Sequence, residues 1–189
     1  MNFVDKLYKK RVTLGFIFGF IFIVFSIPDN LNFLITGIAI GILGEIIRLI
    51  SSGYIIKTDK LATYGPYAFV RHPLYLGSFI MGFGLCLSIF SARYLFIGSF
   101  ISLAFLLFFF AVYIPVLKKE EGVLIEKYGD EYLDYKKHVP MLIPRIFPYK
   151  SKEKGKFQKE VFLNNREYRA ITGLAAIIAI LVIKYLFIN

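Results

Sequence analysis

Long apolar stretches separated by short or basic connections dominate the chain. Five of them stand out, at residues 12–27, 31–50, 74–90, 94–117 and 170–188. A helix that crosses a bilayer needs about 17 to 25 apolar residues, and the first stretch approaches that length because Phe3 and Leu7 precede it. Residues 26–29 offer no small-residue cleavage site, so we expect a retained helix there rather than a signal peptide. The pattern predicts an all-α, polytopic transmembrane helix bundle of about five spans.

Composition supports a membrane protein and excludes several other classes. Hydrophobic residues make up 57% of the 189 residues and charged residues 19%, whereas soluble domains carry about 25% charged residues. The mean hydropathy is +0.64. A single Cys excludes a disulfide framework. With two His and one Cys far apart, no ligand spacing indicates a metal site.

The net charge of +10 is unevenly distributed. Of the 23 Lys and Arg residues, 20 lie in the N-terminal tail, in residues 51–73 and in residues 118–169. Because basic loops stay on the cytoplasmic side, we expect an integral, multi-pass protein with its N-terminus and both long loops cytoplasmic and its C-terminus outside. Lys184, near the end of the last stretch, is expected to snorkel to the outer surface. The basic loops are expected to contact anionic membrane lipids, and no aromatic-basic motif indicates nucleic-acid binding.

Small residues recur four positions apart within the first three stretches: Gly15 and Gly19, Gly37 and Gly41, and Ser78 and Gly82. This spacing predicts close approach of helix backbones. Glu45 and Arg48, three apart in the second stretch, share a helix face. Two interpretations remain open for them, a self-neutralising pair inside the bundle or the lining of a polar pocket.

Arg71 and His72 lie at the entry to the third stretch, directly before Pro73. Proline disfavours helix at the residue before it and suits the first helical turn. A guanidinium, an imidazole and the positive end of a helix then face one spot, which would stabilise an anion such as a carboxylate. The alternative is interfacial anchoring, with Arg71 on lipid phosphate and an aromatic belt of Tyr64, Tyr67 and Tyr75.

A second polar cluster follows the fourth stretch, where Glu120 and Glu121 are adjacent to Lys118 and Lys119. Apolar residues within 123–128 recur with helical spacing, so the fourth helix is predicted to continue to residue 128, past the membrane surface. Adjacent carboxylates here form either a solvated patch or a binding site for a cation.

These motifs together resemble the isoprenylcysteine carboxyl methyltransferase and phospholipid methyltransferase superfamily. The similarity covers about residues 45–147 and is carried by Gly65-Pro66-Tyr67, the segment 71–77, Glu120-Glu121 and the segment 128–144. It implies a membrane methyltransferase core in residues 1–149 that uses S-adenosylmethionine. A cytoplasmic cofactor-capping helix and loop would lie in residues 118–147. Residues 150–169 then form a basic linker, and residues 170–188 an additional transmembrane helix.

The resemblance also implies roles for individual residues. Glu120 and Arg71 are expected at the reacting centre, and six residues are expected to contact the cofactor: His72, Tyr75, Glu121, Tyr135, Val139 and Pro140. One position departs from the pattern. Animal members carry an arginine one helical turn before the glutamate, where this chain has Val116, and Arg71, Lys118 or Lys119 is expected to supply that charge.

Acceptor identity is left open among several classes. The leading expectation is the carboxylate of an isoprenylated cysteine or a similar lipophilic acid, which is already ionised and needs no general base. A phospholipid amine would need a base, for which a glutamate or His72 is the candidate. NADPH-dependent sterol or enone reductases share part of the pattern but usually have more helices, and a non-enzymatic scaffold is the fourth alternative. The oligomeric state is not predicted.

Overall fold

The computed structural model describes residues 3–54, 60–151, 155–164 and 168–188, and these residues form helices without strands. The all-α architecture predicted from the apolar pattern is confirmed. In chain order, the elements are α1 (Phe3–Phe25), α2 (Leu31–Ser52), the short 3₁₀ helix η1 (Gly65–Ala68), α3 (Pro73–Leu87), α4 (Leu95–Tyr128), α5 (Asp130–His138), α6 (Lys159–Asn164) and α7 (Tyr168–Ile188).

Three described helical segments are long and apolar enough to cross a membrane: Leu31–Ser52, Leu95–Tyr128 and Ala170–Ile188. α3 is shorter than its predicted span, because it ends at Leu87 rather than at residue 90. Its 15 residues rise about 22 Å, less than the roughly 30 Å of the hydrocarbon core. The three long apolar helices indicate a membrane protein. Because α3 is short, five complete crossings stay a prediction.

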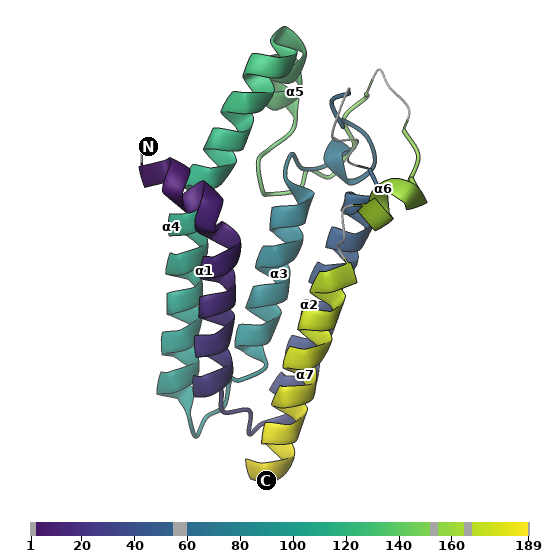
Figure 1. Ribbon diagram of the computed structural model, residues 1–189. Helices are drawn as coiled ribbons and strands as arrows, with labels where there is room; N and C mark the ends of the chain where they lie inside the picture. The colour runs from purple at the N-terminus through teal and green to yellow at the C-terminus, as the bar shows by residue number, and fades with distance from the viewer. Residues whose placement is uncertain (1–2, 55–59, 152–154, 165–167, 189) are drawn as a thin grey trace.

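The long helices run side by side with both extended connections at one end (Figure 1). α1 packs on α4, α2 packs on α3, and α7 lies against α2. The N-terminus lies toward the end that carries α5, and the C-terminus lies at the opposite end. The two basic loops predicted to share one side of the membrane thus share one end of the bundle. Their cytoplasmic orientation stays a prediction from the charge pattern.

Glycines bring the backbones of α2 and α3 into direct contact. A Cβ placed on Gly37 would lie 2.4 Å from the Ser88 nitrogen, and one placed on Gly44 would lie 2.4 Å from the Met81 nitrogen. From the other side, a Cβ on Gly84 would lie 2.5 Å from the Gly41 nitrogen. The predicted close approach is therefore confirmed for this pair of helices. The close contact also includes Gly44 and Gly84, which the four-residue spacing did not single out.

The same prediction is wrong for α1. A Cβ on Gly15 would make an ordinary contact of 3.5 Å with the Tyr113 hydroxyl, and one on Gly19 would have no heavy atom within 4 Å. Aromatic side chains fill this interface instead, since the Phe18 ring stacks on Phe108 with centroids 4.8 Å apart. Rings of this size keep the α1 and α4 backbones apart.

The expected snorkelling of Lys184 to the outer surface stays a prediction, but the structure gives its ammonium group protein partners. Its ammonium donates hydrogen bonds to the backbone oxygens of Ile23 at 2.6 Å and Ser26 at 2.8 Å, with longer contacts to Val24 and to the Ser26 hydroxyl. α1 ends at Phe25, and the last carbonyls of a helix have no partner within it. Lys184 of α7 therefore caps the C-terminal end of α1, which a short-range sequence pattern does not reveal.

The segment predicted as a basic linker packs against the connection between α2 and α3. Gln158 donates a backbone hydrogen bond of 2.9 Å to the Gly53 oxygen, and the Phe157 ring lies edge-on to Tyr54 at 6.1 Å. α6 follows within the same segment. Residues 152–154 and 165–167 of the predicted linker lie outside the described part of the chain.

Replacing Gly44 by Ala tests the α2–α3 contact. The new methyl group would meet backbone atoms that cannot move aside, so we expect Gly44→Ala to lower the free energy of unfolding by about 1–3 kcal/mol. Thermal unfolding in detergent micelles measures the change. Gly173→Ala on α7 is the matched control, because a Cβ there has no heavy atom within 4 Å. A Gly44 variant as stable as this control would contradict backbone contact between the two helices.

Candidate active site

Two distant loops are joined by backbone hydrogen bonds at the end of the bundle that carries α5. Arg71 donates to the Pro140 oxygen at 2.9 Å and His72 to the Met141 oxygen at 3.2 Å. Further along, Arg145 donates to the Phe69 oxygen at 3.0 Å. The motif at residues 71–77 and the motif at residues 128–144 therefore lie against each other, and the loop after α5 is anchored on the turn before α3.

α4 carries the two glutamates to this junction. The helix continues to Tyr128 without a break, so the predicted extension past residue 117 is confirmed. Gly129 then adopts φ +52° and ψ −126°, a backbone conformation that favours glycine, and α5 starts at the next residue. α5 therefore folds back toward the bundle as a cap beside the end of α4.

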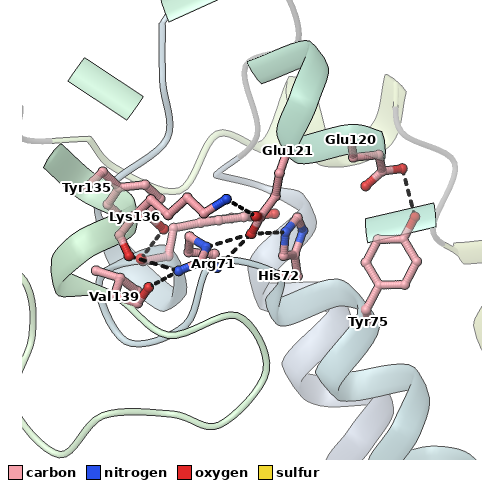
Figure 2. A network of polar contacts seen from close by, with 9 residues as sticks. Arg71, His72, Tyr75, Glu120, Glu121, Tyr135, Lys136 and Val139 are labelled. Carbon is pink, nitrogen blue, oxygen red and sulfur yellow. Dashed lines mark hydrogen bonds and ion pairs between the residues drawn. The ribbon is translucent and has the colours of Figure 1, made fainter. Parts of the chain in front are cut away.

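Glu121 is the centre of a buried ion-pair cluster (Figure 2). Its Oε1 lies 2.7 Å from both Nε and Nη2 of Arg71 and 3.4 Å from Nε2 of His72, and its Oε2 lies 2.8 Å from Nζ of Lys136. The Glu121 side chain is 2% exposed and that of Arg71 is 8% exposed. A single carboxylate thus connects α4, the turn before α3 and α5.

Arg71 is fully engaged within this cluster. Besides Glu121, its Nη1 donates to the backbone oxygens of Lys136, at 3.0 Å, and of Val139. These carbonyls belong to the last turn of α5 and the residue after it, which lack partners within the helix. Arg71 therefore acts as a C-terminal cap for α5 while it pairs with α4. Interfacial anchoring on lipid phosphate, the alternative interpretation, does not fit this placement, and Tyr64 and Tyr67 of the supposed aromatic belt are buried.

The cluster also fixes the protonation state of Glu121, which lies beyond residue 117, where the apolar stretch of α4 ends. Burial alone would raise the pKa of its carboxyl group, but hydrogen bonds from His72, Lys136 and Arg71 and the charge of Arg71 outweigh burial and lower the pKa to about 2. Glu121 is therefore a permanently ionised structural anion at neutral pH.

Glu120 has a different environment although it is the next residue. Its Oε1 accepts a hydrogen bond of 2.7 Å from the Tyr75 hydroxyl and lies 3.5 Å from Nη2 of Arg11 on α1. Arg11 was not predicted as a site residue, because its place in the basic run at residues 9–11 is fully explained by membrane topology. Its position directly before the first apolar stretch is the feature of the sequence that could have marked it as a candidate.

A cavity of about 410 Å³ opens beside Glu120. Its walls come from the loop before α3, from α3 itself, and from α4 and α5, and they include Arg71, His72 and Glu120. The remaining lining combines aliphatic residues and two lysines with five tyrosines, Tyr67, Tyr75, Tyr128, Tyr132 and Tyr135. A small-molecule site of about 300–1,000 Å³ with few polar groups on an aromatic surface is typical of cofactor binding.

The capping residues divide into cavity-lining and supporting ones. Tyr135 lines the cavity and donates a hydrogen bond of 2.6 Å to the Tyr67 oxygen. Burial raises the pKa values of Tyr132 and Tyr135, so both remain neutral hydroxyl groups. Val139 and Pro140 are outside the cavity lining and hold the loop through their backbone oxygens.

The remaining candidates lie apart from the cavity. Arg48 pairs with Glu45 at 3.3 Å and donates to the Ser78 hydroxyl within the bundle, which fits the ion-pair interpretation of these two residues. Val116 is completely buried. Of the lysines expected to replace the family arginine, Lys119 pairs with Asp5 and Lys118 is exposed on the outside of α4.

Comparison with known proteins identifies related chains. The sequence model of the ergosterol biosynthesis ERG4/ERG24 family matches residues 48–149, which is just over half of the chain. Protein-S-isoprenylcysteine O-methyltransferase of Schizosaccharomyces pombe is 37% identical over 91 residues, covering 48% of this chain and 35% of that protein. The enzyme of the same name from Tribolium castaneum is 30% identical over 126 residues, covering 60% and 42%.

Methanethiol S-methyltransferase 2 of Bradyrhizobium diazoefficiens is 37% identical over 81 residues, covering 43% of this chain and 27% of that protein. The chain thus spans less than half the length of these curated relatives. No solved structure matches. The resemblance inferred from the motifs is confirmed by the names of several relatives.

Removing the Arg71 side chain should loosen the cap. Arg71→Ala leaves the Glu121 carboxylate buried with fewer partners, and breaking such a pair costs about 3–5 kcal/mol. We expect faster hydrogen exchange in residues 130–149, while α2 and α3 keep their protection. Arg71→Lys should restore little, because an ammonium cannot replace the planar fork that bridges a carboxylate and two carbonyls. Unchanged exchange in both variants would contradict the role of Arg71 as an anchor of the cap.

Acid should release the same cap in a defined pH window. Because the folded pKa of Glu121 is about 2 and its ordinary value is 4.5, its stabilising effect is complete above pH 4.5 and is lost as the pH falls toward 2. Protection factors of residues 130–149 measured across this range report the change. In Glu121→Gln, protection should be lower at neutral pH and nearly constant through the window. Parallel curves for wild type and variant would rule out Glu121 as the titrating group.

Proposed function

The chain belongs to the ergosterol biosynthesis ERG4/ERG24 family, and from this membership, its relatives and the cavity at Glu120 we propose that it is a membrane methyltransferase. We propose S-adenosylmethionine as its methyl donor and a lipophilic acid as its acceptor. The observation that carries the proposal is the aromatic cavity in which Glu120 lies, at the end of helices that are apolar enough to cross a membrane.

The residues around the cavity fit the chemistry of this cofactor. S-adenosylmethionine combines a sulfonium cation, an ammonium group, a carboxylate and an aromatic base. Tyrosine faces attract cations, and five tyrosines line the cavity. Glu120 is suited to pair with the ammonium group, while Lys60 and Lys127 in the same lining supply positive charge for the carboxylate.

When bound, the cofactor supplies an electrophilic methyl group. The protein positions the acceptor and keeps water out, which for an already ionised carboxylate is the main catalytic requirement. Tyr75 fixes the Glu120 carboxylate through its hydroxyl group. The α5 cap, anchored by Arg71 on Glu121, covers the site. In this proposal Glu120 contacts the reactants, whereas Arg71 and Glu121 are positioning residues.

The acceptor is proposed to be the carboxylate of an isoprenylated cysteine or a similar lipophilic acid, bound at the cytoplasmic face of the membrane. Two observations support it: the name of the relatives from S. pombe and T. castaneum, and the grouping of the basic loops at the end of the bundle that holds the cavity. Prenylated proteins or small molecules are the corresponding partners.

Reduction of a sterol or enone with NADPH is the second candidate, favoured by the description of the matching family as one of ergosterol biosynthesis. Titration calorimetry of the purified protein with S-adenosylhomocysteine and, in parallel, with NADPH separates the two. We expect saturable binding of S-adenosylhomocysteine. Binding of NADPH alone would overturn the methyltransferase proposal, and binding of neither would favour a scaffold.

Glu120→Gln and His72→Ala probe the site assignment in the same experiment. Glu120→Gln removes the charge proposed to pair with the ammonium group, and we expect at least 10-fold weaker binding, equivalent to about 1.4 kcal/mol. His72→Ala removes a cavity wall and should also weaken binding. Glu126→Gln is the matched control, since Glu126 is exposed on the same helix. Equal affinities of the Glu120 variant and this control would remove Glu120 from the cofactor site.

A further inference from the structure

Arg11 of α1, a helix outside the motifs, lies beside Glu120, which lines the cavity, although Arg11 itself is not part of the lining. Its Nη2 lies 3.5 Å from the Glu120 carboxylate, whose other partner is the Tyr75 hydroxyl at 2.7 Å. Its Nη1 donates to the Tyr8 oxygen at 3.3 Å, and its guanidinium lies over the Tyr8 ring at 4.2 Å. Arg11 therefore approaches Glu120 from α1, and Tyr75 approaches it from α3.

The first turns of α1 are held in this position by contacts with α4. Asp5 pairs with Lys119, and the Lys119 ammonium lies 4.9 Å from the centre of the Tyr8 ring. Arg11 pairs with Glu120, the residue after Lys119. These adjacent attachments align α1 with the end of α4, so the position of the Arg11 guanidinium is set by the fold.

Three other arginine and lysine side chains close to the two glutamates pair with other groups. Arg71 and Lys136 neutralise Glu121 on the side of the cap. Arg48 pairs with Glu45 and donates to Ser78 deeper in the bundle. Among the described residues, Arg11 is the cation that forms an ion pair with Glu120.

An anionic acceptor needs a cation at this point. A carboxylate that approaches the reacting centre also approaches Glu120, whose side chain is 24% exposed, and two like charges at close range repel each other in such a partly buried site. The Arg11–Glu120 separation of 3.5 Å exceeds the 2.7–2.9 Å of a strong charge-assisted hydrogen bond. This loose pair leaves the guanidinium able to exchange partners, and its planar fork matches a carboxylate.

Arg11 also marks the boundary between the polar end of α1 and its apolar segment. The residues that follow expose large apolar side chains, with Val12 62%, Phe16 75% and Phe20 69% exposed. In a membrane these side chains contact lipid. A lipophilic molecule that arrives from the bilayer alongside α1 meets the Arg11 guanidinium where the apolar surface ends.

We propose that Arg11 binds the anionic group of the acceptor and makes the protein select lipophilic carboxylic acids over uncharged analogues with the same hydrocarbon chain. This proposal rests on the methyltransferase function proposed above. Arg11 offsets the charge of Glu120 in the free protein and the charge of the acceptor in the complex.

Binding of N-acetyl-S-farnesylcysteine and of its uncharged carboxamide tests the proposal. Calorimetry is performed on the full-length protein in detergent, saturated with S-adenosylhomocysteine. We expect wild type to prefer the acid, and Arg11→Gln to weaken binding of the acid at least 10-fold while binding of the carboxamide changes less than twofold. Arg11→Lys keeps the positive charge but not the planar guanidinium, so its affinity for the acid should lie between those of wild type and Arg11→Gln. It also provides the readout if Arg11→Gln does not fold.

Lys10→Gln is the matched control, because it removes the same charge from the neighbouring exposed residue and should leave both affinities unchanged. Equal losses for acid and carboxamide in Arg11→Gln would indicate a packing role and overturn the proposal, as would an unchanged affinity for the acid. Weaker binding of S-adenosylhomocysteine by the same factor would place Arg11 in the cofactor site instead. Failure of wild type to bind S-adenosylhomocysteine would refute the methyltransferase function itself, which distinguishes the two proposals.

Discussion

The architecture of the site depends on the ion pairs and hydrogen bonds of one buried group, the Glu121 carboxylate. A carboxylate out of water is tolerated only with well-placed partners, and Glu121 has Arg71, His72 and Lys136 around it. These residues come from the turn before α3 and from α5. Satisfying one anion therefore fixes the end of α4, the start of α3 and the cap relative to each other, and the cavity is the space that remains between them.

Adjacent glutamates have opposite roles because of helix geometry. Successive residues of an α-helix point about 100° apart, so Glu121 faces the cap while Glu120 faces Tyr75 and Arg11. One carboxylate is saturated by short contacts, and the other has a loose cationic partner at 3.5 Å. In the proposed function, this pair of identical residues separates structural support, by Glu121, from contact with reactants, by Glu120.

Much of this arrangement could be predicted from the sequence, because apolar length, proline position and helical spacing act locally. They gave the all-α bundle, the start of α3 at Pro73 and the extension of α4 to Tyr128. What escaped prediction depends on partners distant in sequence. The Lys184 ammonium finds the end of α1, and Arg11 finds Glu120. Both residues lie at the end of an apolar stretch, where a basic residue is common, so no short-range pattern distinguished them from ordinary flanking charges.

The helices outside the family match also depend on one another. α1 and α7 both lie beyond residues 48–149, and the Lys184 ammonium of α7 holds the terminal carbonyls of α1. The shared segment contains Tyr75, Glu120 and the cap, whereas Arg11 is supplied from outside it. Under the proposed methyltransferase function, divergence of this outer helical pair would change which acceptors are bound while the residues proposed for methyl transfer persist in the central segment, so that acceptor choice and methyl transfer could evolve as separable traits.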